Sequence, residues 1–198
     1  MTRLFHAGLK AGRTRQKGVF TIELALVGSV IILFLAFISD MVGKQALEGQ
    51  LQRLSYSAAS IIKERTQLYS TSASEIDALD DVQVNQLYRI VRDSMGRTNG
   101  DFKETSLGMR LEQLKYHYDS TSKTVKPAPL VSYARGLQGC QPELDLSSHS
   151  SDLKVGTSDQ SGATLYQVTL CYQGNNWFGS MVGEDYSTVR AYSIMIGR

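Results

Sequence analysis

The feature that most constrains this chain is a run of 20 residues, 19–38, that contains a single charged side chain, Glu23. Twenty helical residues extend about 30 Å at about 1.5 Å per residue, which matches the thickness of the hydrocarbon layer of a bilayer. With its polar end at Asp40, the run predicts a transmembrane helix over residues 19–40. The rest of the chain is interpreted around this anchor.

The residues before this run are basic and contain no acid. Five cationic side chains lie within residues 1–18: Arg3, Lys10, Arg13, Arg15 and Lys17. Removing these five from the 21 basic residues leaves 16 against 19 acidic residues, so the remainder carries a net charge of −3. An acidic body argues against binding to nucleic acid. Because cationic flanks stay on the cytoplasmic side, we expect a cytoplasmic leader over residues 1–18 and a body outside the membrane.

The helix is expected to continue beyond the membrane as an amphipathic segment over residues 41–70. Apolar side chains recur there at spacings of three and four, interrupted by one charged residue. The stripe consists of Leu47, Leu51, Leu54, Ala58, Ile61, Arg65 and Leu68. We favour packing of this stripe against the chain's own globular domain. Packing against neighbouring helices in an assembly is the alternative, and both kinds of contact can occur at different levels along the helix.

Residues 71–198 are expected to form an exported domain. A Ser/Thr-rich break at 70–74 and a helix-start pattern at 74–77 precede a second helix over about 82–95. Strand patterns follow at 114–118, 130–133, 164–172 and 188–196, with a long loop over 136–163. The last strand is apolar on both faces and is expected in a central or covered position. The fold class is therefore α+β, with a long helix, a shorter helix and a mostly antiparallel sheet of about four strands.

The two cysteines, Cys140 and Cys171, both lie in the expected exported domain. If the domain is exported we expect them to pair, and a closed loop of about 30 residues then contributes roughly 3–4 kcal/mol under the chain-entropy model. Two buried free thiols are the alternative.

The sequence contains no spacing typical of a phosphate loop, a zinc protease, a serine hydrolase or a redox dithiol. His117 is expected on a strand surface and His149 in a solvated loop. The acids Asp77, Asp80 and Asp81 are expected at a solvated helix start rather than around calcium. We therefore predict no catalytic residues, no cofactor, no metal and no enzymatic activity.

Aromatic side chains gather near the C-terminus of the chain. Packing in the core or in a hairpin is favoured over an exposed adhesive patch. The residues concerned are Tyr166, Tyr172, Trp177, Phe178 and Tyr186.

Glu23 is a functional candidate, because an ionisable group within a membrane helix costs on the order of 2–3 kcal/mol at the bilayer centre and less near its edge. The alternative is a carboxylate that snorkels to the near interface, since Glu23 lies one turn inside the run. The small residues Ala25, Gly28 and Ser29 interrupt the apolar run or suit close helix packing.

The segment Gly18 to Leu24, with a basic leader before it and an apolar run after it, resembles the cleavage region of type IV prepilins and pseudopilins. That family has a glycine, a cleaved bond and a glutamate five residues after the glycine, which match Gly18, the Gly18–Val19 bond and Glu23. Val19 stands where many members have phenylalanine, so an N-methylated phenylalanine is not implied. The stretch from Thr21 to Val27 is most similar to minor pilins of the tight-adherence (Tad/Flp) system, of the TadE/TadF kind, and we lean towards TadF.

This resemblance implies a minor pilin of a Tad-type pilus, cleaved after Gly18 and needed for pilus assembly and surface adherence. It implies that Glu23 pairs with the terminal amine of a neighbouring subunit, and that a face with Ala25, Gly28 and Ser29 packs on other subunits. Implied partners are a prepilin peptidase, other minor pilins, the major pilin, the assembly platform and the lipid bilayer. The implied location is the bacterial inner membrane, with the N-terminus cytoplasmic and the C-terminal domain periplasmic, or the pilus itself.

Two alternatives to the minor-pilin interpretation stay open at this point. One is a bitopic envelope protein with an uncleaved anchor, acting as a periplasmic binding module. The other is a membrane-tethered periplasmic enzyme, against which the missing catalytic spacings argue.

Overall fold

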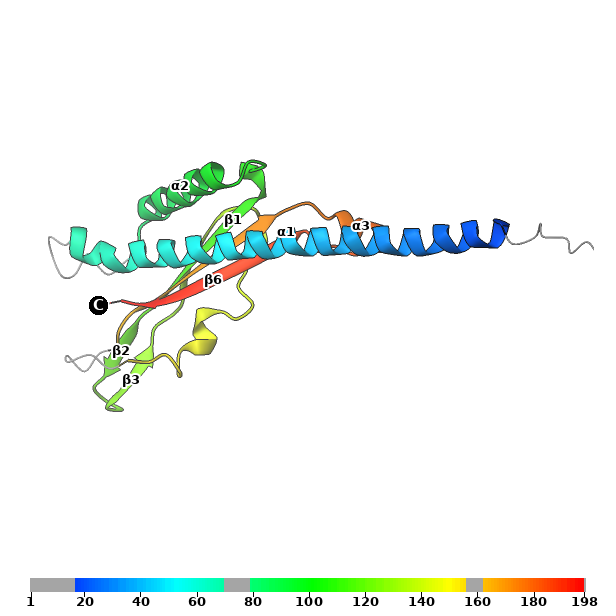
Figure 1. Cartoon of the computed structure of the whole chain (residues 1–198). Helices are drawn as coiled ribbons and strands as arrows, with labels where there is room; N and C mark the ends of the chain where they lie inside the picture. The colour runs from blue at the N-terminus through cyan, green and yellow to red at the C-terminus, as the bar shows by residue number, and fades with distance from the viewer. Residues whose placement is uncertain (1–16, 70–78, 156–161, 198) are drawn as a thin grey trace, which may run out of the picture. The chain divides into compact units, whose positions relative to one another are not determined.

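One long helix, α1 (Lys17–Tyr69), begins the described part of the chain. The computed structural model describes residues 17–69, 79–155 and 162–197, and divides into two compact units, Met1–Met41 and Val42–Arg198. The α1 helix contributes to both units, which agrees with the expected long N-terminal helix and its amphipathic continuation (Figure 1). Residues 1–16 of the expected leader, and the expected break and helix start at 70–77, lie outside the described residues.

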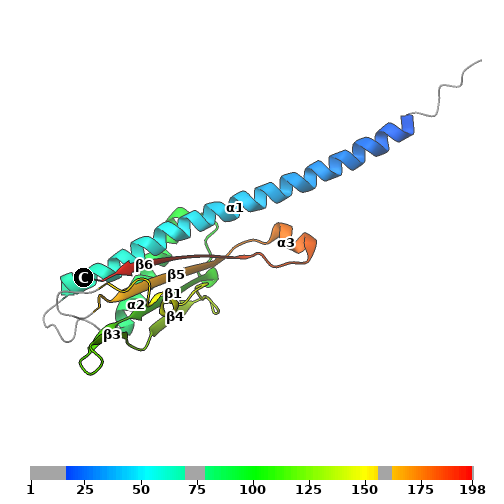
Figure 2. The same ribbon diagram turned by 90° about the horizontal axis from the view of Figure 1, so that it is seen from below.

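The second unit is built on a four-stranded antiparallel sheet in the order β4-β1-β5-β6 (Figure 2). A separate antiparallel hairpin joins β2 and β3. The bounds are α2 (Asp81–Thr98), β1 (Leu107–Leu114), β2 (Tyr116–Asp119), β3 (Thr124–Pro127), β4 (Val131–Gly136), β5 (Leu165–Gln173), α3 (Trp177–Val182) and β6 (Thr188–Ile196). Two 3-10 turns, η1 (Glu104–Ser106) and η2 (Leu146–His149), complete the described elements. The expected α+β class is confirmed.

The main core lies between one face of the sheet and the two helices α1 and α2. Alternate residues of β1 and β5 point into it, because successive side chains of a strand face opposite sides. The buried apolar side chains are Leu51, Ala58, Ala59 and Ile62 of α1, Val84, Leu87, Val91 and Met95 of α2, and Leu107, Met109, Leu111, Tyr166, Val168, Leu170, Tyr172 and Ala191 of the strands. The second half of α1 therefore packs on the chain's own sheet, as favoured from its pattern.

Arg65 and Leu68 of the expected α1 stripe have side chains outside the described part of the chain, and one of the other positions is wrong. Ile61 is 44% exposed, whereas its neighbour Ile62 is 3% exposed and lies in the core. A broad stripe on a straight helix drifts relative to a strict repeat of three and four, so the buried face moves by one residue over several turns. Ser55 also lies on this face, where its Oγ shares a 2.8 Å hydrogen bond with Ser193 of β6.

The opposite face of the sheet is covered by the segment that follows β4. The Gln167 side chain of β5 donates a hydrogen bond to the carbonyl oxygen of Leu144 at 3.2 Å, and Leu146 N–H donates to Glu112 Oε2 at 3.2 Å. Gly108 allows this segment to approach β1, because a Cβ at position 108 would lie 2.9 Å from Cys140 Cβ. Both faces of β1 are consequently buried.

Two further elements differ from the expectation, and one agrees with it. The strand β1 was not expected, although Leu107, Met109 and Leu111 alternate with polar residues, because a face that carries Arg110 and Glu112 is not expected to be buried. The strand β6 has the expected bounds and lies at the edge of the sheet rather than at its centre, but α1 covers one of its faces, so the covered alternative of the expectation holds. The short helix α3 lies directly after the expected turn at 174–176 and was also not expected.

Candidate processing and assembly site

The candidate site lies in the first two turns of α1. Gly18 and Val19 belong to the helix, and Glu23 follows one turn later on an exposed part of its surface. Residues four apart lie on the same face, separated by about 6 Å along the axis. Helical side chains lean towards the N-terminus, so the Glu23 carboxylate extends from its own backbone in the direction of Val19.

The small residues expected to pack against other helices lie on a different face. At about 100° per residue, Gly28 lies about 140° and Ala25 about 200° around the helix from Glu23. Ser29 donates a 2.8 Å hydrogen bond from Oγ to the carbonyl oxygen of Leu26, so its hydroxyl is satisfied within the helix. A Cβ at Gly28 would meet nothing within 4 Å. One face of this half of α1 thus carries the carboxylate and the other carries the small residues.

The surface around these residues is apolar and exposed. Large apolar side chains from Val19 to Val42 are between 37% and 70% exposed, the highest value belonging to Ile22. Exposed apolar surface of this extent marks contact with a membrane or with other proteins. Within the described residues, one helix is long and apolar enough to cross a membrane, and this helix is α1 from Val19 onward.

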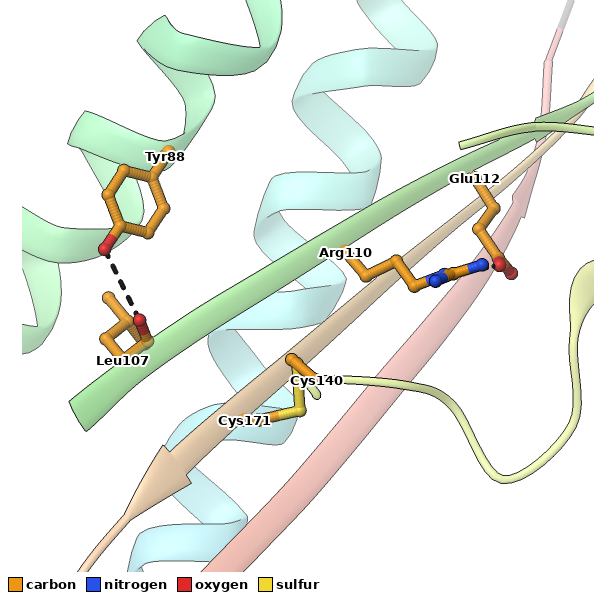
Figure 3. Close-up of a disulfide and its surroundings, with 6 residues drawn as sticks. All are labelled: Tyr88, Leu107, Arg110, Glu112, Cys140 and Cys171. Atoms are coloured by element: carbon orange, nitrogen blue, oxygen red, sulfur yellow. Dashed lines mark hydrogen bonds and ion pairs between the residues drawn. A yellow bond between two sulfur atoms is a disulfide. The ribbon is translucent and has the colours of Figure 1, made fainter. Parts of the chain in front are cut away.

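The two cysteines form a disulfide on the covered face of the sheet. Cys140 and Cys171 are joined in the structure, with their Cα atoms 5.6 Å apart (Figure 3). The expected pairing is present, and both residues are buried. The bond connects the segment after β4 to the C-terminal part of β5, which holds that segment against the sheet.

A buried ion pair that was not expected from the sequence lies on the same face. Arg110 Nε donates to Glu112 Oε1 at 2.8 Å, and the Glu112 side chain is fully buried (Figure 3). Two charged residues separated by two positions in a strand share a face, and that spacing was the available signal. The pair lies under the segment that covers the sheet and has the contacts of a structural pair.

The histidines and acidic residues that were weighed as candidates either match their expected surroundings or differ from them. His117 is exposed on β2, as expected, and Asp81 pairs with Arg135 at the start of α2. His149, in contrast, is half-buried in η2, and its Nε2 is a buried atom without a hydrogen-bond partner, so the expectation of a solvated loop is wrong. Asp77 lies outside the described residues. In the part of the chain that the structure describes, no group of three or more His, Cys, Asp or Glu side chains is arranged to hold a metal ion.

The aromatic residues near the C-terminus include both buried and exposed side chains. Tyr166 and Tyr172 are buried in the core, and the hydroxyl of Tyr172 accepts a 2.9 Å hydrogen bond from Lys103 N–H. Trp177 and Tyr186 are 73% and 51% exposed, so the expectation of core or hairpin packing is wrong for these two side chains. They belong to the connection between β5 and β6.

The decisive comparison is with protein families. Residues 13–198 match the family model described as "Putative tight adherence pilin protein F", TadF. The chain belongs to the TadF family. No curated protein and no solved structure matches the chain.

Membership in the TadF family explains why the first half of α1 is apolar and exposed. A pilin family and one N-terminal apolar helix among the described residues together indicate a membrane-anchored, single-pass protein. The chain is accordingly a component of a Tad pilus that interacts with other pilus components, and the family is one of structural proteins rather than of enzymes.

Proposed function

We propose that this TadF chain is a minor pilin that a prepilin peptidase cleaves after Gly18, and that it is needed for pilus assembly and surface adherence. The observation that carries the proposal is the first half of α1, an exposed apolar surface with one carboxylate, Glu23, five residues after Gly18. A helix of this kind is stable in a bilayer, or among other helices of the same kind in a filament.

Cleavage is the first proposed step. Hydrolysis of the Gly18–Val19 bond consumes one water and leaves a carboxylate on Gly18 and an amine on Val19. Gly18 has no side chain and its backbone is less restricted than that of other residues, which suits entry into a narrow peptidase cleft. Because both residues lie in α1, the first turn of the helix has to open before the bond can be cut. Cleavage removes five cationic side chains from the chain, because all five lie in the leader.

Pairing of Glu23 is the second proposed step. A carboxylate in the hydrocarbon layer is unfavourable until a cation neutralises it. The new amine of Val19, when protonated, carries the opposite unit charge. Within one chain the amine and Glu23 lie about 6 Å apart along the axis. A neighbouring subunit shifted along the filament axis can bring its own amine to Glu23, and this contact would then define the axial register between subunits.

The small-residue face supplies the third element of the proposal. Ala25, Gly28 and Ser29 let another helix approach α1 closely on the side away from Glu23. Each subunit would thus present two different contact faces, one electrostatic and one steric. The partners of these faces are other minor pilins and the major pilin, with the assembly platform receiving the subunit from the inner membrane.

The proposed orientation follows from charge. The basic leader stays on the cytoplasmic side, so the N-terminus is cytoplasmic and residues beyond the membrane segment are periplasmic. A periplasmic location agrees with the Cys140–Cys171 disulfide, because disulfides persist in oxidising compartments.

The proposal is tested by separating cleavage from assembly. Glu23→Ala should leave the protein cleaved and membrane-inserted, yet reduce sheared surface pili and adherence about tenfold, as expected for loss of a buried charge pair. Glu48→Ala, which removes an exposed carboxylate from the second half of the same helix, is the matched control and should behave as wild type. Wild-type piliation in Glu23→Ala cells would refute the pairing.

A further inference from the structure

The connection between β5 and β6 carries an exposed apolar surface that the proposed function does not use. It consists of Trp177, Met181, Val182 and Tyr186, which are 73%, 67%, 53% and 51% exposed. Trp177 and Met181 are four residues apart in α3 and share a face. We call these four side chains the α3 patch.

The α3 patch is held in a defined shape. The Asn176 side chain donates to the carbonyl oxygen of Glu184 at 2.8 Å and accepts from Tyr186 N–H at 3.2 Å. Glu184 N–H donates to the Gly179 carbonyl at 2.9 Å, and Gly183 provides the left-handed turn with φ +81°. An apolar surface presented on a hydrogen-bonded turn is ready for a partner, because little ordering is left to be done on binding.

The short length of chain between the apolar run and the patch identifies the partner. Within the second unit, Lys44 Nζ lies 5.6 Å from the centre of the Tyr186 ring, and a Cβ at Gly174 would lie 3.6 Å from Leu47. Lys44 follows Ile38, the last residue of the apolar run, by six residues, so the chain keeps Lys44 within about 22 Å of the end of that run at about 3.6 Å per extended residue. The headgroup layer extends about 5–8 Å beyond the hydrocarbon on each side of a bilayer, so a patch tethered by this short segment is within reach of it.

The chemistry of the patch fits that surface. Tryptophan and tyrosine are enriched at the boundary between hydrocarbon and headgroups, where an apolar ring and a polar N–H or O–H are both satisfied. Lys44 can extend its ammonium group into the headgroups. A charged group near the patch limits how deeply the patch can enter the bilayer. Hydrogen bonds from the Ser187 side chain and backbone keep the pKa of Asp185 below its usual value, with a smaller contribution from Lys44. Asp185 therefore stays ionised, and an ionised carboxylate favours water over the hydrocarbon layer.

We propose that the α3 patch docks on the lipid headgroup layer from which α1 emerges, as a second, interfacial contact between the unassembled subunit and the membrane. The inference rests on the membrane anchoring of α1 and not on cleavage. The contact would set the height and tilt of the second unit on the bilayer and would have to be released when the subunit enters a filament.

The chain contains one tryptophan, so Trp177 reports on the patch without any label. The full chain is reconstituted in phosphatidylethanolamine/phosphatidylcholine vesicles that contain lipids brominated either near the headgroup or deep in the acyl chains. We expect Trp177 emission to be quenched at least about twofold by shallow bromines and less by deep ones, as for an interfacial aromatic residue. Met181→Asp with Val182→Asp should remove most of this quenching, since both side chains are exposed and fill no core.

Two reporters in a Trp177→Phe background serve as controls. The Phe34→Trp reporter lies in the apolar half of α1, where the native side chain is 59% exposed, and should be quenched by deep bromines. The Tyr118→Trp reporter lies on β2, which the two views show at the opposite end of the sheet from α3, and should not be quenched (Figures 1 and 2).

The outcomes are distinct. If the Phe34→Trp reporter is quenched while Trp177 responds only as weakly as the Tyr118→Trp reporter, the interfacial contact is refuted and the membrane anchor stands. If the Phe34→Trp reporter is not quenched either, membrane anchoring itself is refuted. If Trp177 is shielded from aqueous acrylamide without lipid quenching, and dilution in excess lipid removes the shielding, the patch binds a second copy of the chain and the lipid proposal is refuted.

Discussion

The two halves of α1 have the same secondary structure and opposite surroundings. From Val19 to Val42 large apolar side chains are exposed around the whole helix, whereas from Leu47 to Ile62 most of them are buried or half-buried on one side, against the sheet. A helix that is apolar all round requires an apolar environment, and a helix with one apolar stripe requires a single packing partner. The first half therefore depends on lipid or on other subunits, and the second half is satisfied by its own domain.

The largest expected effect concerns the first half. Gly28→Leu adds a bulky side chain where a Cβ meets nothing, so the isolated subunit should keep its stability. Packing against a neighbouring helix would be blocked, and incorporation into sheared pili should fall about tenfold. Gly49→Leu, at a similarly open position in the second half, is the control and should assemble normally. Normal assembly of both variants would show that the small-residue face is not a packing face.

The second prediction tests the second half with adjacent residues of one type. Ile62→Ala should lower the free energy of unfolding by about 2–5 kcal/mol, since it leaves a cavity in the core. Ile61→Ala should cost less than about 1 kcal/mol, and Ile32→Ala in the first half should cost about nothing. The measurement is guanidinium unfolding of the full chain in detergent, followed by near-ultraviolet circular dichroism. Equal losses for Ile61→Ala and Ile62→Ala would mean that the packed face is assigned incorrectly.

The third prediction concerns the sheet that receives the second half. Replacing Cys140 and Cys171 together by alanine should lower the free energy of unfolding by about 2–4 kcal/mol, because the unfolded chain gains freedom. Extraction of the protein from membranes should be unchanged, since the apolar first half is not altered. Reduced wild-type protein should match the double variant. An unchanged unfolding midpoint would show that the disulfide does not stabilise this domain.

The smallest effect tests the junction of the two halves. Gly43 is helical, and an added Cβ meets nothing, so Gly43→Ala should raise the free energy of unfolding by about 0.5–1 kcal/mol through helix propensity. Gly183→Ala should have the opposite sign, a loss of about 1–2 kcal/mol, because its φ of +81° disfavours a Cβ. If Gly43→Ala destabilises the protein, α1 is not helical at this position.

Most of the long elements could be predicted from local pattern alone. The stripe of α1 and the helical spacing in α2 each arise from one buried face, which leaves a regular pattern in the sequence. In β5 the apolar face packs on the helices, and the opposite face is also buried. The strand β1 alternates too, but its second face carries two charged residues. Its Glu112 is buried because Arg110 and Leu146 satisfy it, and Leu146 comes from a segment 34 residues away.

The functional candidates also divide into those that local spacing reveals and those that depend on the folded chain. Gly18, Val19 and Glu23 are recognised by spacing within one helix, so the sequence alone was enough to propose them. The exposure of Trp177 was not predictable, because the sequence pattern does not indicate to which side an aromatic residue after a turn points. What turns it outward is the set of hydrogen bonds made by Asn176 to Glu184 and Tyr186, which only the folded connection brings together.

The central claim is that the Gly18–Val19 bond is cut. The most direct test is the intact mass and N-terminal sequence of protein extracted from membranes, compared between cells with and without a prepilin peptidase and with a Gly18→Leu variant. We predict a chain that begins at Val19 in cells with the peptidase, and a full-length chain both in cells without it and in the variant. A chain that begins at Met1 in cells with an active peptidase would contradict the account.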